Sequence, residues 1–206
     1  MIVISKEVKA ESIAISSITY LDKSEYWRGI TAIFTHYDIM HLAGNIYSSL
    51  LISFLEYVYG NIGILKLITI IAIFAPFIDS LIRKIFDINR KMYCVGFSYI
   101  IFGLLPVIYK HIDQCKIFGF AFPCILVPFI EMIISQIVST NSSFVGHLSG
   151  IIVGFALYFD FFFWYTDNMF CITFPLIVFF YFNSYIKYKK KNTPNRKRGK
   201  GRYIGC

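Results

Sequence analysis

Four polar side chains stand within long apolar stretches and have the types that acyl transfer requires. Ser98 lies in "VGFSYIIFGLL", His147 lies in "GHLSGIIVG", and His41 and Asn45 are four residues apart in "HLAGN". Histidine is the usual base that activates a serine hydroxyl for nucleophilic attack. No Asp or Glu lies at a matching depth in these stretches, so the pattern predicts a Ser98–His147 catalytic dyad.

The same residues can also supply hydrogen-bond donors for an oxyanion. Ser98 follows Gly96 and is expected in the first turns of a helix, where the amides have no intrahelical partner and can point at developing negative charge. His41 and Asn45 are spaced to share one face of a helix. We expect both side chains to complete an oxyanion hole. The alternative for these two is an interhelical hydrogen-bond pair.

Two further features favour a close contact between the serine and histidine segments. Phe102 lies one helical turn after Ser98 and is expected to stack on the imidazole, with ordinary packing as the alternative. Gly146, Gly150 and Gly154 recur every four residues beside the histidine. A stripe of small residues lets one helix backbone approach another closely, so these glycines are expected to face the serine helix.

The elements that must position these residues are membrane helices. The chain has 206 residues, a mean hydropathy of +0.63 and 57% hydrophobic residues, more than the average soluble domain. Helices are expected because lipid requires backbone groups to be satisfied within the segment. The candidate segments are 38–59, 64–82, 93–109, 117–138, 143–163 and 169–186. If every segment crosses, the first, third and fifth are parallel, so the four polar residues lie at similar depth.

The net charge of +8 arises from the end of the chain. Residues 187–206 hold nine Lys or Arg and no acid, which leaves 11 basic and 12 acidic residues elsewhere. This composition predicts a disordered tail that faces anionic lipid headgroups on the cytoplasmic side, rather than nucleic acid. The five cysteines show no metal-ligand spacing, and those in apolar runs are expected to act as small hydrophobic residues. No metal or organic cofactor is implied.

Four stretches, taken in order, resemble the rhomboid intramembrane serine proteases over about residues 26–160: "WRGITAIFTHYDIMHLAGN", "LEYVYG", "VGFSYIIF" and "GHLSGIIVG". The motifs "VGFS" and "GHLSGIIVG" are most similar to those of the eukaryotic endoplasmic-reticulum subgroup. The resemblance implies an all-α polytopic membrane protein, a rhomboid-like bundle of about six membrane segments without the family's first helix. The implied parts are an N-terminal segment and first-loop region (1–37), the membrane domain (38–186) and the basic tail (187–206).

In function, the resemblance implies a multi-pass serine endopeptidase of the endoplasmic reticulum that cleaves membrane-anchored proteins near the lumenal or external face. Ser98 would attack and His147 would take the proton. Asn45, His41 and the Ser98 amide would bind the oxyanion, with Gly96 and Phe102 in supporting positions.

Departures from the family pattern keep other interpretations open. Tyr99 follows the serine where the family has glycine, which favours an inactive pseudoprotease that binds transmembrane clients. An unrelated transporter or channel subunit would instead use Glu131 and Asp79 as intramembrane charges.

The family topology would also place the basic residues of 82–91 on the non-cytosolic side, against the usual preference. A crossing segment at 169–186 would put the basic tail there too. We expect either that this segment is re-entrant or interfacial, or that the missing first helix of the family changes the orientation.

Overall fold

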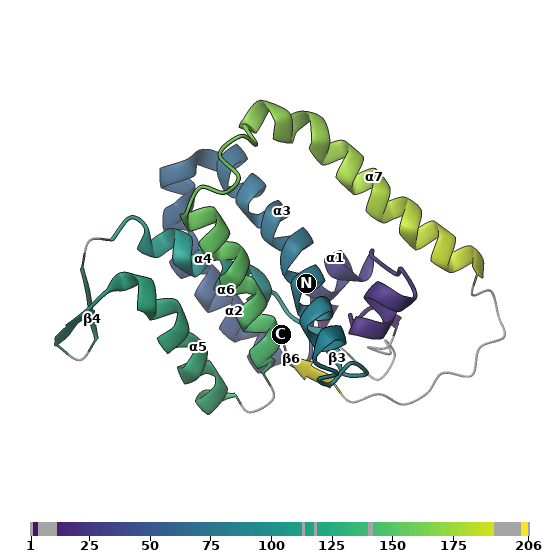
Figure 1. Ribbon diagram of the computed structural model, residues 1–206, viewed down its shortest axis with the longest axis horizontal. Helices are drawn as coiled ribbons and strands as arrows, with labels where there is room; N and C mark the ends of the chain where they lie inside the picture. The colour runs from purple at the N-terminus through teal and green to yellow at the C-terminus, as the bar shows by residue number, and fades with distance from the viewer. Residues whose placement is uncertain are drawn as a thin grey trace.

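The computed structural model describes residues 2–3, 12–112, 114–117, 119–139, 142–191 and 203–205, and helices carry most of them (Figure 1). The α-helices are α1 (Arg28–Ile33), α2 (Ile39–Ile52), α3 (Phe54–Ile85), α4 (Ser98–Tyr109), α5 (Val127–Val138), α6 (Phe144–Tyr158) and α7 (Asp167–Lys191). A π-helical turn, η2 (Ile18–Asp22), and a 3-10 turn, η3 (Cys124–Leu126), precede α1 and α5. The predicted helical bundle is therefore confirmed.

Short strands tie the connecting segments together. Strand β1 (Ile2–Val3) pairs in parallel with β2 (Thr35–His36), and β3 (Tyr93–Val95) pairs in parallel with β6 (Tyr203–Gly205). Strands β4 (Cys115–Ile117) and β5 (Phe120–Phe122) form an antiparallel hairpin. In Figure 1 this hairpin and α5 lie on one flank of the bundle, and α7 lies on the other.

Helix α4 is the centre of the bundle, because every residue from Ser98 to Val107 is buried. It packs against α6, α3 and α2. A helix that is apolar on all sides requires neighbours on all sides. Helix α4 begins at the end of the bundle where α6 begins and α3 ends, and we call this end the site end. The other end of the bundle holds the end of α4 and the hairpin.

The glycine stripe of α6 lies against α4, as the spacing predicted. A Cβ added at Gly150 would lie 2.6 Å from the Tyr99 carbonyl oxygen, and one at Gly154 would lie 2.3 Å from the Gly103 carbonyl oxygen. At Gly146 the added atom would lie 3.3 Å from the Tyr99 ring. The two helix backbones are therefore in direct contact, which only residues without a side chain allow.

We expect Gly150→Leu to destabilise the protein by about 3 kcal/mol or more, because its side chain would meet backbone and force the two helices apart. The midpoint of thermal unfolding in detergent measures this effect. Gly44→Leu is the matched control, since an added Cβ at Gly44 meets nothing within 4 Å. Equal unfolding midpoints for the two variants would contradict the packing role of the stripe.

Among the described helices, two are long and apolar enough to cross a membrane: α3, with an 18-residue window of mean hydropathy 2.1, and α7, with a window of 1.7. Helix α3 is interrupted at Gly60, where φ is 66° and ψ is 172°, a conformation that favours glycine. Helices α4, α5 and α6 have 12 to 15 residues. A re-entrant loop at 169–186 is wrong, because α7 is one continuous helix of 25 residues; an interfacial helix stays a prediction.

Helix α7 also corrects the predicted start of the basic tail. The helix continues beyond 186 to Lys191, so the first residues assigned to the tail are helical. Except for β6, the rest of the tail lies outside the described residues. At the other terminus, described residues 12–37 form η2, α1 and β2, with no helix of crossing length among them.

The expected helix at 117–138 begins later than predicted. Its first residues belong to the β4–β5 hairpin, which turns at Gly119 with φ of 83°. A disulfide joins Cys115 to Cys124 across the base of the hairpin. These two cysteines are therefore covalently paired, and the expectation that they act as free hydrophobic residues is wrong.

Candidate active site

Ser98 is the first residue of α4, and its position depends on the glycine before it. Gly96 has φ of 132°, which favours glycine, and its N–H donates to the Ala32 carbonyl at 3.0 Å. This contact anchors the chain to the end of α1 as it turns from β3 into α4. The Ser98 side chain is buried, and its hydroxyl oxygen has no hydrogen-bond partner among the described residues.

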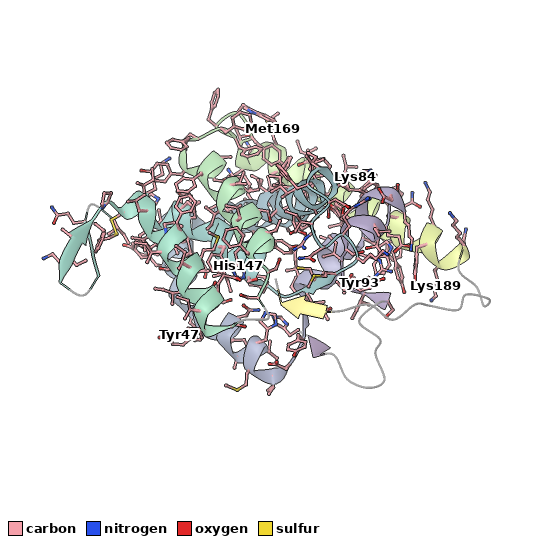
Figure 2. The ribbon with its side chains drawn as sticks, turned by 60° about the horizontal axis from the view of Figure 1, so that its bottom comes forward. Tyr47, Lys84, Tyr93, His147, Met169 and Lys189 are labelled. Carbon is pink, nitrogen blue, oxygen red and sulfur yellow. A yellow bond between two sulfur atoms is a disulfide. The ribbon has the colours of Figure 1, made fainter. Side chains whose placement is uncertain are left out.

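His147 lies in the second turn of α6, in the interior of the bundle, where it is 3% exposed (Figure 2). Its Nδ1 lies 3.1 Å from the hydroxyl oxygen of Ser135 on α5. That hydroxyl already donates its proton to the Met132 carbonyl at 2.8 Å. A hydroxyl has a single proton, so while that proton lies on the Met132 carbonyl, the Ser135 oxygen accepts from His147 Nδ1–H. The neutral imidazole then carries its lone pair on Nε2, where a general base needs it.

Phe102 stacks on His147, as the sequence predicted. The ring centroids are 4.0 Å apart and the ring planes are inclined by 19°. Phe102 lies one turn after Ser98, so the stack holds the imidazole beside the first turns of α4. No hydrogen bond joins Ser98 to His147 in this structure. Catalytic hydrogen bonds are commonly long without substrate and tighten when it binds.

The two predicted oxyanion donors lie on α2, which packs against α4. Asp38 caps α2 by accepting the His41 backbone N–H at 2.7 Å. His41 lies within electrostatic range of His147, and its ring contacts His36 edge-on at 5.2 Å between centroids. Asn45 is buried one turn further along. The structure therefore brings His41 toward the histidine and buries Asn45 one turn further on the same helix.

Buried polar atoms without a partner gather around this region. The described residues hold nine such side-chain atoms, and five of them belong to His36, His41, Asn45 and Ser98. Buried polar groups in native proteins nearly always have a hydrogen-bond partner. Burial and the neighbouring His41 lower the pKa of His36 to about 4, so this imidazole is neutral at physiological pH. The cluster has the polar groups that a bound peptide could satisfy.

Tyr99 is fully buried and lies between α3 and α6. Its ring faces Gly146, and its phenol lies within electrostatic range of Asp79 and Arg83, without a hydrogen bond of good geometry. Successive residues of a helix are rotated by about 100°, which directs Tyr99 to a different neighbour from Ser98. The tyrosine thus fills the α3–α6 interface.

A charged pair that sequence reasoning did not assign to the site positions α6. Arg83 Nε donates to both carboxylate oxygens of Asp79 at 3.0 Å, and Arg83 Nη2 donates to the Ser143 hydroxyl at 2.6 Å. Ser143 in turn caps α6 by accepting the Gly146 N–H at 3.0 Å. The end of α3 therefore holds the start of the helix that carries His147.

The partners of Asp79 and Glu131 bear on the transporter interpretation. Asp79 is paired with Arg83, and Glu131 accepts the Tyr109 hydroxyl at 2.6 Å. Each carboxylate is thus occupied by a partner within the bundle, as in ordinary structural pairing.

Fold and site together describe an integral membrane protein with a serine and a histidine on adjoining helices. A Rhomboid domain model matches residues 23–164, so the chain belongs to the rhomboid family. Putative rhomboid protein L523 of Acanthamoeba polyphaga mimivirus is 32% identical over 122 residues, covering 59% of this chain and 67% of the relative.

Two relatives come from Arabidopsis thaliana. Rhomboid-like protein 15 is 28% identical over 148 residues, which cover 66% of this chain and 37% of the relative. Rhomboid-like protein 14, mitochondrial, is 34% identical over 74 residues, which cover 34% of this chain and 22% of the relative. The chain therefore spans well under half the length of both plant relatives. No solved structure matches the chain.

Asn45→Ala is expected to lower turnover on the order of 100-fold, as for other oxyanion donors, with little change in the unfolding midpoint. The comparison of kcat with thermal stability separates the two effects. Ser49→Ala is the control, because Ser49 lies one turn further on α2 and, among the described residues, bonds only the Asn45 carbonyl. An unchanged rate in Asn45→Ala would assign Asn45 to structure.

Proposed function

We propose that this rhomboid is an active intramembrane serine endopeptidase. The observation that carries the proposal is the bond from His147 Nδ1–H to Ser135, because it leaves Nε2 free to act as a base. The stack of Phe102 on the same ring favours an imidazole held in one orientation beside the serine helix.

In the proposed reaction, the Ser98 oxygen attacks the carbonyl carbon of a substrate peptide while His147 Nε2 takes the hydroxyl proton. The resulting oxyanion is stabilised by Asn45, His41 and the Ser98 amide. The imidazolium then gives its proton to the leaving amine, and the peptide bond breaks. Water, deprotonated by the same imidazole, hydrolyses the acyl-enzyme and restores the serine hydroxyl.

The alternative is a pseudoprotease that binds transmembrane clients without cleaving them. The absence of a hydrogen bond between Ser98 and His147 favours this alternative. The position of Tyr99 supports activity, because its ring packs between α3 and α6 instead of covering the serine. The endopeptidase remains our proposal because an inactive protein has no need of a fixed histidine tautomer.

A serine-directed fluorophosphonate probe tests the proposal on the purified protein. We expect labelling at Ser98, found by mass spectrometry of the labelled peptide, and no labelling of Ser98→Ala. Cleavage of a model transmembrane substrate in liposomes should depend on the same residue. A folded protein that is neither labelled nor able to cleave, but that retains the substrate in pull-down, would establish the pseudoprotease instead.

We also propose the endoplasmic reticulum as the location of this multi-pass protein. The support is the similarity of the motifs "VGFS" and "GHLSGIIVG" to the endoplasmic-reticulum subgroup noted above. Imaging of the full chain beside reticulum and mitochondrial markers tests it, and mitochondrial fluorescence would overturn it.

A further inference from the structure

We propose that a pocket between the end of α7 and the η2–α1 segment binds the phosphate headgroup of an anionic phospholipid. The pocket has a volume of about 620 Å³, and its lining includes Lys23, Tyr26, Ser184, Lys187, Tyr188 and Lys191. Ligand pockets commonly fall in this range of volume. The proposal concerns binding alone and holds whether or not Ser98 is catalytic.

The acidic residues of the pocket wall are already neutralised by partners. Asp22 accepts from Lys84 at 2.8 Å and from Arg90 at 2.6 Å. The hydrogen bond from Lys84 lowers the pKa of Asp22, so this carboxylate stays ionised and paired at neutral pH. Glu25 accepts from Arg28 Nε at 2.5 Å. Neither carboxylate therefore cancels a lysine that faces the pocket.

Three ammonium groups remain for a ligand. Lys23, Lys187 and Lys191 line the pocket, and none of them forms an ion pair with a residue that the structure describes. Lys187 and Lys191 are four residues apart, so they share one face of α7. Ser184 and Asn183 add neutral hydrogen-bonding groups to the same wall. Several cations beside hydroxyl and amide groups suit a phosphate.

The surface of α7 next to the pocket favours a lipid over a free anion. Ile172, Leu176, Phe179 and Phe182 are exposed along the helix before its lysines, and such a surface suits acyl chains. Where α7 reaches the pocket, Trp27 packs against the rings of Tyr185 and Tyr188. Tyrosine and tryptophan gather at the level of lipid headgroups. A headgroup in the pocket would thus leave its chains along apolar α7.

The exposed basic residues are concentrated at the end of the bundle that holds the pocket. Helix α7 starts beside Lys66, with which Asp167 pairs, and ends at the site end; Met169 and Lys189 mark its two ends in Figure 2. The opposite end of the bundle carries Lys66, Lys110 and Lys116. The exposed or half-buried basic residues at the site end are Lys23, Lys84, Arg90, Lys91, Lys187, Lys189, Lys190 and Lys191.

Clusters of basic residues near a membrane surface attract anionic lipid headgroups. The charge of the site end therefore suits the proposed ligand.

Thermal unfolding of the full chain in detergent, with short-chain phosphatidylserine, phosphatidylcholine or inorganic phosphate added at equal concentration, tests the proposal. We expect phosphatidylserine alone to raise the unfolding midpoint. Lys187→Gln/Lys191→Gln should weaken its apparent affinity about 10- to 30-fold, from about 1 kcal/mol for each lysine near a headgroup. Lys91→Gln/Lys116→Gln, with the same change in net charge, should bind as the parent does.

Each other outcome contradicts the proposal. Equal stabilisation by phosphatidylcholine would show that no anionic headgroup is recognised. Equal stabilisation by inorganic phosphate would assign the pocket to a soluble anion. The same loss of affinity in both double variants would show that net charge, and not the pocket, attracts the lipid.

Discussion

Tyr99→Gly should destabilise the protein by about 3–5 kcal/mol, the usual cost of removing a buried aromatic ring. The substitution would restore the residue that the family normally has after the serine. In this bundle, however, the ring fills the space between α3, α4 and α6, and removing it leaves a cavity beside Gly146. The midpoint of thermal unfolding and the denaturant midpoint in detergent measure the loss.

Tyr99→Phe is the matched control for this prediction. It keeps the ring and removes only a hydroxyl that lacks a well-formed hydrogen bond, so we expect a change within about 1 kcal/mol. A Tyr99→Gly protein as stable as the parent would show that the ring is dispensable for packing. A Tyr99→Gly protein that is as stable as the parent and cleaves a substrate that the parent does not cleave would show that the tyrosine closes the site.

His147→Ala is expected to reduce kcat/KM for a transmembrane substrate by about 10³-fold or more, as loss of the base does in serine proteases. The residue supplies the base and its ring packs on Phe102, so the unfolding midpoint is measured beside the rate. Residues of one catalytic unit act together, so Ser98→Ala/His147→Ala should be no slower than the worse single variant.

Ser135→Ala separates orientation of the histidine from its chemistry. The variant keeps the imidazole and removes the acceptor at Nδ1, so we expect a smaller loss, on the order of 10- to 100-fold. Cleavage that persists in both His147→Ala and Ser98→Ala would contradict the dyad. A loss in Ser135→Ala as large as that in His147→Ala would make Ser135 as important as the base.

The sequence predicted the parts of the structure that depend on local pattern. The helix containing Ser98, the glycine stripe of α6 and the contact of Phe102 with His147 were all predictable, because helical spacing determines which side chains share a face. The orientation of Tyr99 toward a neighbouring helix was also predictable from the rotation between successive residues. The roles of His41 and Asn45 stay predictions, although the structure places His41 near the histidine and buries Asn45 on the same helix.

The features that the sequence missed depend on contacts between distant segments. Ser135 lies on another helix from His147, and a serine in a membrane helix usually bonds a carbonyl of its own helix. The Cys115–Cys124 disulfide was missed because five cysteines do not determine their own pairing. The charge argument against a crossing α7 assumed the usual orientation of the family. The structure places the basic end of α7 against the η2–α1 segment, a contact that the charge pattern alone does not predict.

The bond between Ser135 and His147 links the chemistry to the position of α5. This helix exposes much of its surface and packs mainly through Val127, Pro128 and Met132. If α5 moved outward, the Nδ1 proton would lose its acceptor, and the neutral imidazole would exchange between two tautomers. Only one of them has a lone pair on Nε2. With α5 outward, only part of the His147 population could accept the serine proton at Nε2. The return of α5 would restore the tautomer that acts as a base.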